Sequence, residues 1–334
     1  MEKLLHTTEK SKSKKVLMLL NYLQKNGPQS RIDLSKKLNL TKAVITSLTN
    51  EMITSGVVLE KGELVEATGT HSRGRRKTLL DINENYKLVF GVVIEKETVF
   101  VGLTNLKGQV LDKRKKNFHD ISYRELLELI VLNISTIMKN NCITNENILG
   151  LGVCVSRGGG DLIEGAKKMD KITRLKKDLT HALPIKIATN ATIAGGLVAQ
   201  RIFTQERSKS VLLLRLGEVA ESGVMIDGVV YRGFTGNAGG FWGILDEVIK
   251  DSKNSQEYFE QVTTSILTCH TVLDTEKIFC FGAQFENSGF MNCIQELLIK
   301  RGCKNVQLER PLLTDDTVFL SPCAQAIESF FYMN

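Results

Sequence analysis

Apolar and polar positions in the first 60 residues repeat with the period of an α-helix, in short segments. A first stripe runs through residues 14–24 (KKVLMLLNYLQ), and Gly27-Pro28 ends it. Its apolar members are Val16, Leu17, Leu20 and Leu23. Ser30 then caps a second helix, in which Asp33 can complete a capping box. The buried side of this second helix would comprise Ile32, Leu34 and Leu38.

A third helix follows a tight turn at Asn39-Leu40. Thr41 caps it, and a stripe of Ile45, Leu48 and Met52 repeats until the helix ends near Gly56. Three short helices with a tight turn between the last two describe a helix-turn-helix, whose third helix enters the major groove of DNA. The candidate DNA contacts are residues on its solvent side and at the start of the second helix: Ser30, Arg31, Thr41, Lys42, Ala43, Thr46, Ser47 and Asn50.

Two β-rich segments after the third helix predict a wing. GVVLEK (residues 56–61) and KTLLDIN (residues 77–83) can pair, although Lys61-Gly62 offers an alternative turn. Between them, HSRGRRK surrounds a permissive glycine with positive charge, which suits phosphate contact or insertion into a minor groove. The wing residues expected at DNA are Arg73, Arg75, Arg76 and Lys77.

Positive charge is concentrated in this head. Residues 1–80 hold 15 Lys and Arg against seven Asp and Glu, a balance of +8, so the other 254 residues carry −1 of the total +7. A basic head on a near-neutral body favours a polyanionic partner. A solvated lysine-rich terminus is the alternative that charge alone leaves open.

From residue 87 the pattern changes to apolar strands separated by short turns. A helix starts at Ser122, where Glu125 can complete a capping box. A three-stranded meander followed by alternating helices and strands occurs twice, which predicts an α/β body of two lobes facing across a cleft. The expected strands cover residues 87–95, 98–106, 108–118, 148–155, 184–190, 211–217, 222–228, 229–233 and 277–282.

Over nearly its whole length the chain resembles the ROK family (repressors, open reading frames and sugar kinases), in its transcriptional-regulator branch. The segments that carry the resemblance are RIDLSKKLNLTKAVITSLTNEMITSGVV, RGRRKTLLDIN, LGLGVCVSRGGGD, LPIKIATNATIAG and DGVVYRGFTGNAGGFWGIL. The resemblance implies a winged helix-turn-helix over residues 1–84 and, over 85–334, a sugar-kinase-like domain with the two-lobed actin-like, ribonuclease H-like ATPase fold. Lobe one would cover about 85–200 plus a C-terminal helix at 318–334, and lobe two about 201–317.

The phosphate loops that kinases of this family use are altered. In the first loop, Val93 stands for the family's aspartate, and Glu95, Lys96 and Glu97 stand for Gly-Gly-Thr. The glycine-rich second loop reads GEVAESG and carries Glu218 and Glu221. A carboxylate about 4 Å from a phosphate charge adds repulsion on the order of 1 kcal/mol in water and ~4 kcal/mol at an effective dielectric constant of 20. We therefore expect no ATP and no other cofactor.

The residues that would activate a sugar are also replaced. Asn190 falls where the family has its catalytic aspartate, and an amide cannot act as a general base. The sugar-contact segment GEIGH has become GGFWG, with Gly240 for the glutamate and Gly243 for the histidine, and the family's cysteine-rich zinc loop is missing. We expect no catalytic residues and no metal site, so the chain would not be an enzyme.

A sugar pocket that survives between the lobes would correspond to Gly158, Gly159, Asn190, Gly236 and Asn237. The two asparagines could hydrogen-bond the hydroxyls of a sugar or sugar phosphate effector. Equally open is that the glycines serve turns and the asparagines cap helices.

These features favour a DNA-binding transcriptional regulator, a repressor of carbohydrate-related genes, that binds a double-stranded operator as a homodimer or homotetramer. Two alternatives are a ROK sugar kinase with a fused DNA-binding head and a regulator whose body is a scaffold without ligand. No apolar run is long enough to span a bilayer, and the N-terminus lacks a signal-peptide segment. Seven scattered cysteines without a C-x-x-C pair favour reduced thiols, so we expect a cytoplasmic protein without a membrane partner.

Overall fold

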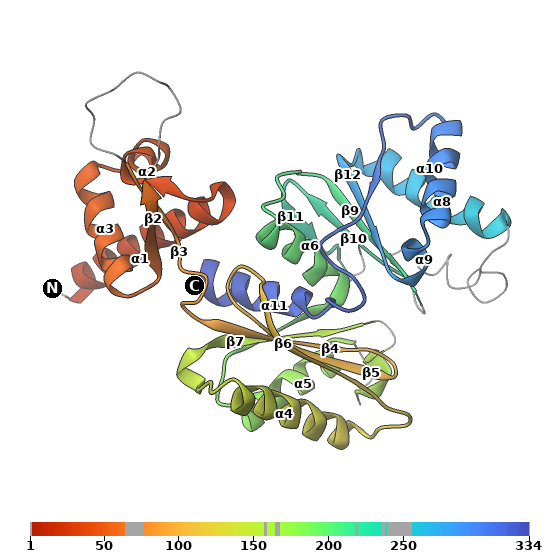
Figure 1. Cartoon of the computed structure of the whole chain (residues 1–334), viewed down its shortest axis with the longest axis horizontal. Coiled ribbons are helices and arrows are strands. Elements are labelled where there is room, and N and C mark those ends of the chain that lie inside the picture. Colours follow the sequence, from red (N-terminus) through yellow and green to blue (C-terminus); the bar gives the residue numbers. More distant parts are fainter. Residues whose placement is uncertain are drawn as a thin grey trace.

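A computed structural model of the chain describes residues 2–63, 77–156, 159–163, 168–217, 220–234, 238 and 256–333. It shows an N-terminal head followed by two α/β lobes, each built on a five-stranded sheet (Figure 1). This is the head-and-two-lobes architecture that the sequence predicts. None of the described helices combines the length and the hydropathy of a membrane-spanning segment.

The head contains three helices and a small antiparallel sheet of strand order β1-β3-β2. The Ser30 hydroxyl accepts a hydrogen bond from the Asp33 amide at 3.2 Å, and the Thr41 hydroxyl accepts one from the Val44 amide at 3.3 Å, so both predicted caps are confirmed. The elements are α1 (Glu2–Asn26), β1 (Gln29–Ser30), α2 (Arg31–Leu38), α3 (Lys42–Thr54), β2 (Val58–Glu63) and β3 (Thr78–Ile82).

Two details of the head differ from the prediction. Helix α1 begins at Glu2, not near residue 14, because the polar residues before the apolar stripe include good helix formers such as glutamate and lysine. Ile32 is 40% exposed, whereas Leu34 is fully buried. The short helix α2 therefore packs on the core through a narrower stripe than its apolar residues suggest.

The first lobe has the sheet order β6-β5-β4-β7-β8. Strands β4, β5 and β6 form the predicted antiparallel meander, while β7 and β8 add to it in parallel. Helices α4 and α5 cover one face through an apolar core. The elements are β4 (Leu88–Ile94), β5 (Thr98–Thr104), β6 (Val110–Asn117), α4 (Tyr123–Asn140), β7 (Ile148–Val155), α5 (Lys168–Ala182), β8 (Ile187–Ala191) and α6 (Thr192–Phe203).

The second lobe repeats this plan with the sheet order β11-β10-β9-β12-β13. Helices α8 and α10 cover its outer face, with Tyr258 and Phe285 fully buried in that core. The elements are β9 (Val211–Leu216), β10 (Ala220–Ile226), β11 (Val229–Tyr231), α8 (Gln256–Leu273), β12 (Lys277–Phe281), α9 (Ala283–Glu286), α10 (Ser288–Lys300) and β13 (Leu308–Glu309).

Helices α6 and α11 (Leu320–Ile327) form a layer between the two sheets, and a short π-helical turn (Glu328–Tyr332) continues α11 (Figure 1). Glycines in the first sheet make room for α11. A Cβ atom on Gly152 would overlap the backbone of Pro322, and one on Gly91 would overlap the backbone carbonyl of Phe319. Replacing either glycine would push α11 off the sheet.

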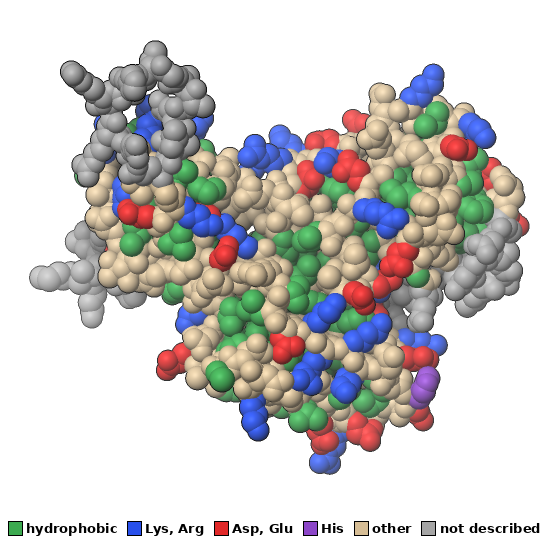
Figure 2. Space-filling view, viewed as in Figure 1, with side chains coloured by type: hydrophobic (Ala, Val, Ile, Leu, Met, Phe, Trp, Pro, Cys, Tyr) green, Lys and Arg blue, Asp and Glu red, His purple; other side chains and the backbone are tan. Residues whose placement is uncertain are grey.

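The end of the chain lies beside the head (Figure 1), and the space-filling view shows that the head and the body are in contact (Figure 2). The Asn21 side chain on α1 donates to the carbonyl of Tyr332 at 3.3 Å, and the rings of Tyr86 and Phe331 lie 6.4 Å apart. Asp81 of β3, only 2% exposed, pairs with Lys61 on the wing and with Lys107 on the turn between β5 and β6. Apolar core and ion pairs together connect the wing to the first lobe.

Candidate nucleic-acid interface and interlobe site

Helix α3 separates buried from exposed side chains as the sequence predicts. The stripe of Ile45, Leu48 and Met52 is at most 5% exposed. The opposite side is exposed and comprises Thr41, Lys42, Ala43, Thr46, Ser47 and Asn50. A face of small, polar and cationic groups on a rigid helix is suited to the major groove, where amides and hydroxyls reach base edges.

Arg31 at the start of α2 connects three elements of the head. Its Nε donates to the Thr49 hydroxyl at 3.0 Å, one terminal nitrogen contacts Glu60 of β2 at 3.1 Å, and the other donates to the Asn50 amide oxygen at 3.2 Å. Arg31 thus fixes α3 against α2 and the wing. By holding the Asn50 oxygen, it also orients the NH₂ group of Asn50.

Ser30 does not match the expectation of a side-chain contact with DNA. The residue is 2% exposed, and its hydroxyl donates to the Asp33 carboxylate at 2.6 Å while capping α2. The reason is that an N-cap hydroxyl must point into the helix that it caps. Of the predicted wing residues, Arg73, Arg75 and Arg76 lie outside the described residues, and Lys77 is half-buried just before β3 begins at Thr78.

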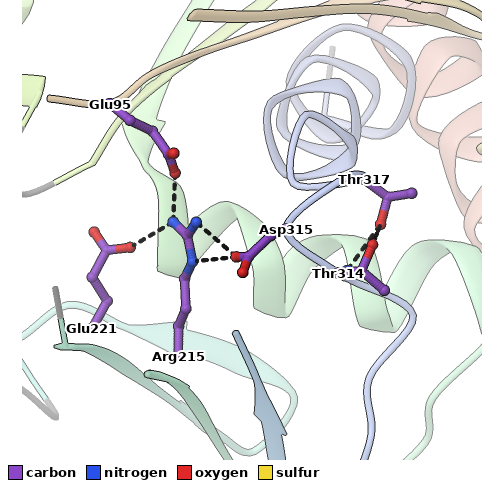
Figure 3. Close-up of polar contacts among 6 residues, drawn as sticks. All are labelled: Glu95, Arg215, Glu221, Thr314, Asp315 and Thr317. Atoms are coloured by element: carbon purple, nitrogen blue, oxygen red, sulfur yellow. Dashed lines mark hydrogen bonds and ion pairs between the residues drawn. The ribbon is translucent and has the colours of Figure 1, made fainter. Parts of the chain in front are cut away.

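A buried arginine lies between the positions of the two altered phosphate loops (Figure 3). Arg215 on β9 is opposite Glu221 in the ladder with β10, and its Nη1 lies 3.5 Å from Glu221 and 2.6 Å from Glu95, just after β4. Its Nη2 contacts Asp315, before α11, at 2.8 Å. This interlobe cluster of Glu95, Arg215, Glu221 and Asp315 joins the first lobe to the second.

The interlobe cluster corrects one part of the sequence argument. From the sequence, Glu95 and Glu221 are expected to oppose a phosphate as loop carboxylates, but in the structure both pair with Arg215, which lies in the apolar run VLLLRLG, and Glu221 lies on β10. Burial on its own would lower the pKa of Arg215, but Glu95, Glu221 and Asp315 raise it, so the guanidinium stays charged. Three carboxylates around one guanidinium still leave an excess of negative charge between the two lobes at this point.

Other groups of the protein already contact the candidate sugar-contact residues that the structure describes. Asn190 is 4% exposed; its oxygen accepts from Arg232 at 2.6 Å and its NH₂ donates to Gln325 of α11. Gly159 is buried against the Ile94 carbonyl, where a Cβ atom would clash. Gly158, Gly236 and Asn237 lie outside the described residues. Among the described residues, no group of three or more His, Cys, Asp or Glu side chains is arranged to hold a metal ion.

Comparisons with known proteins agree with this geometry. Residues 12–58 match a family model described as winged helix-turn-helix DNA-binding. The xylose repressor of Caldicellulosiruptor bescii is 29% identical over 241 residues, which are 70% of this chain and 58% of that protein. A crystal structure titled as a ROK family transcriptional regulator, homolog of E. coli MLC protein, is similar with a TM-score of 0.70 and 16% identity over 95% of this chain and 96% of that one. The chain thus has the fold of a ROK family transcriptional regulator.

The two-lobed body also has the fold of a sugar kinase. A ROK hexokinase from Thermus thermophilus is similar with a TM-score of 0.57 and 13% identity, over 72% of this chain and 98% of that one. The chain spans less than two thirds of the length of the xylose repressors that it matches.

The sequence did not reveal the contacts of Arg31, Arg215 and Arg232 within the protein, because most partners of these arginines are distant from them along the chain.

Proposed function

We propose that this chain is a DNA-binding transcriptional regulator of the ROK family, a repressor of carbohydrate-related genes, with a non-catalytic sugar-kinase-like body. The observation that carries the proposal is the exposed polar face of α3 on a winged head that matches a DNA-binding family model. The relatives described as xylose repressors support the same function.

In this proposal α3 lies in the major groove. Lys42 at the start of the helix contacts a phosphate or a guanine edge, and the oriented NH₂ group of Asn50 donates to a base acceptor. Thr46 and Ser47 complete the surface that faces the bases. Two heads of a homodimer, or pairs within a homotetramer, would bind half-sites about one helical turn apart or a multiple of it on a near-palindromic operator.

The body contributes regulation and assembly in place of phosphate transfer. The interlobe cluster puts excess negative charge at the former phosphate site, and the catalytic aspartate of the family is Asn190 here. A sugar or sugar phosphate effector would bind near Asn190, displacing Arg232 or sharing it. Because Asn190 also contacts Gln325 of α11, which leads to the head, binding there can change how the head is held.

The wing prediction concerns salt dependence. Replacing Arg75 and Arg76 with alanine is expected to weaken DNA binding and to reduce the slope of log K against log [salt] by about two, because each lost phosphate contact removes about one released counterion. Fluorescence anisotropy at several salt concentrations measures this slope. An unchanged slope would mean that these arginines do not contact the DNA backbone.

Capture of sheared genomic DNA by the full chain tests the function as a whole. The wild type should enrich discrete fragments, and a Lys42→Ala/Asn50→Ala variant should not. Equal recovery of all fragments by both would reject sequence-specific binding.

A coupled ATPase assay with hexoses, pentoses and acetylated amino sugars tests the kinase alternative, for which sugar-dependent turnover is required. A thermal-shift screen with the same sugars separates a sensing body from a scaffold, because a ligand bound only by the folded state raises the unfolding midpoint.

A further inference from the structure

A pocket of about 360 Å³ lies where the head meets the body, away from the candidate sugar site. Helix α1 forms its head side. The end of α6, residues 205–209, the β10–β11 turn and the end of the chain form its body side. A volume of this size is at the lower end of the range for small-molecule sites, roughly 300–1,000 Å³.

The charged groups of this junction pocket fall into two sets. Arg201 pairs with Glu328 and donates to the Gly228 carbonyl at 2.8 Å, so it is already satisfied. The Glu206 carboxylate accepts from the amides of Arg207 and Ser208, both at 2.9 Å, and pairs with Lys277 at 3.2 Å. The charges of Arg201 and Glu206 are therefore already paired with other groups of the protein.

The second set is mainly cationic. Lys25 of α1, Arg207 and Lys209 line the pocket, and within the described residues none of the three side chains has an ion-pair partner. Among the lining residues that the structure describes, Asp227 is the one carboxylate in this set. The unmatched charge at the pocket is therefore positive, so an anion would be favoured there.

We propose that the junction pocket binds a small phosphorylated metabolite. An arginine and two lysines can provide charge-assisted hydrogen bonds to the oxygens of one phosphate group, and the volume leaves room for a small organic part. None of the described residues of the altered phosphate loops, and none around Asn190, lines this pocket. Because the pocket is formed by both the head and the body, a bound phosphate would contact both.

Few polar contacts hold the head to the body at this pocket. Gln24 donates to the carbonyls of Arg201 and Ile202, both at 3.3 Å, and Asn21 donates to the Tyr332 carbonyl. A phosphate held between Lys25 on the head and Arg207 and Lys209 on the body stabilises this docked arrangement. That the docked arrangement of the head matters for operator binding rests on the proposed function. Binding of the phosphorylated metabolite to the pocket does not.

Isothermal titration calorimetry of the full chain without DNA tests the site. The probes are inorganic phosphate, ribose 5-phosphate and glucose 6-phosphate, with ribose and glucose as uncharged controls. At least one phosphate probe should bind the wild type, and Arg207→Ala/Lys209→Ala should weaken it by about tenfold or more through lost charge-assisted hydrogen bonds. Lys25→Ala should weaken it as well. The control Lys113→Ala/Lys116→Ala removes the same charge from exposed positions on β6 and should stay within about twofold of wild type.

Three results would overturn the proposal. One is that no phosphate probe binds. Another is that the β6 control weakens binding as much as the pocket variant, which would mean attraction to surface charge in general. The third is that Arg207→Ala/Lys209→Ala lowers DNA affinity without changing the binding of phosphate probes, which would make these cations DNA backbone contacts.

Discussion

Replacing Lys42 and Asn50 together with alanine is expected to weaken operator binding by roughly two orders of magnitude. A lost base-edge contact costs about 1–3 kcal/mol, and loss of a cation near phosphates adds to that cost. The Asn50 substitution removes the donor that Arg31 orients, and the Lys42 substitution removes the cation at the start of the exposed face. Anisotropy titrations at one fixed salt concentration measure the effect.

The structure also indicates how to separate this effect from unfolding. Both side chains are exposed on α3 and alanine favours helices, so the main loss is the hydrogen bond that Arg31 donates to Asn50, and stability should fall by no more than about 1 kcal/mol. Lys113→Ala on β6 of the body removes one exposed charge and should leave DNA affinity nearly unchanged. If the double variant binds as tightly as the wild type while remaining folded, α3 does not read DNA.

Replacing Arg215 with methionine is expected to destabilise the folded chain by about 3–5 kcal/mol, which is typical of removing one partner from a buried ion pair. Its side chain is 9% exposed, and the change leaves Glu95, Glu221 and Asp315 facing one another without a cation. Urea unfolding measures the change. Arg301→Met breaks a surface pair with Glu260 and, as a control, should cost no more than about 1 kcal/mol.

The pH dependence of the Arg215→Met variant identifies the cause of its instability. Repulsion among three carboxylates raises their pKa values in the folded variant above those in the unfolded chain. Such groups favour folding at low pH, and this contribution is lost as the pH rises through the raised values. The gap in stability between variant and wild type should therefore shrink as the pH falls from 7 towards 5. A constant gap would point to lost packing, not to charge.

The head was predictable because its signals are local. Ser30 and Thr41 occupy cap positions, and the stripe of Ile45, Leu48 and Met52 fixes which side of α3 is exposed. The strand meanders of the body were predictable for the same reason, because short apolar runs separated by turns mark each strand locally. Burial of Ser30 and exposure of Ile32 escaped the pattern, because both depend on how α2 lies on the rest of the head.

The interlobe site was predictable only in part. The sequence shows that Glu95 and Glu221 replace loop residues of the family, and that Asn190 replaces an aspartate. It does not show that Arg215 meets three carboxylates, because Glu95 and Asp315 are more than 90 residues from it along the chain. Pairings over such distances are set by the packing of α6 and α11 between the sheets, which no local pattern encodes.

Selection of bound duplexes from a random DNA pool tests most directly whether this chain reads DNA sequence. After several rounds with the wild type, the account predicts one enriched motif, with half-sites in inverted orientation if the chain acts as a dimer. The Lys42→Ala/Asn50→Ala variant should not enrich that motif. A pool that stays random with the folded wild type, over a range of salt concentrations, would contradict the account.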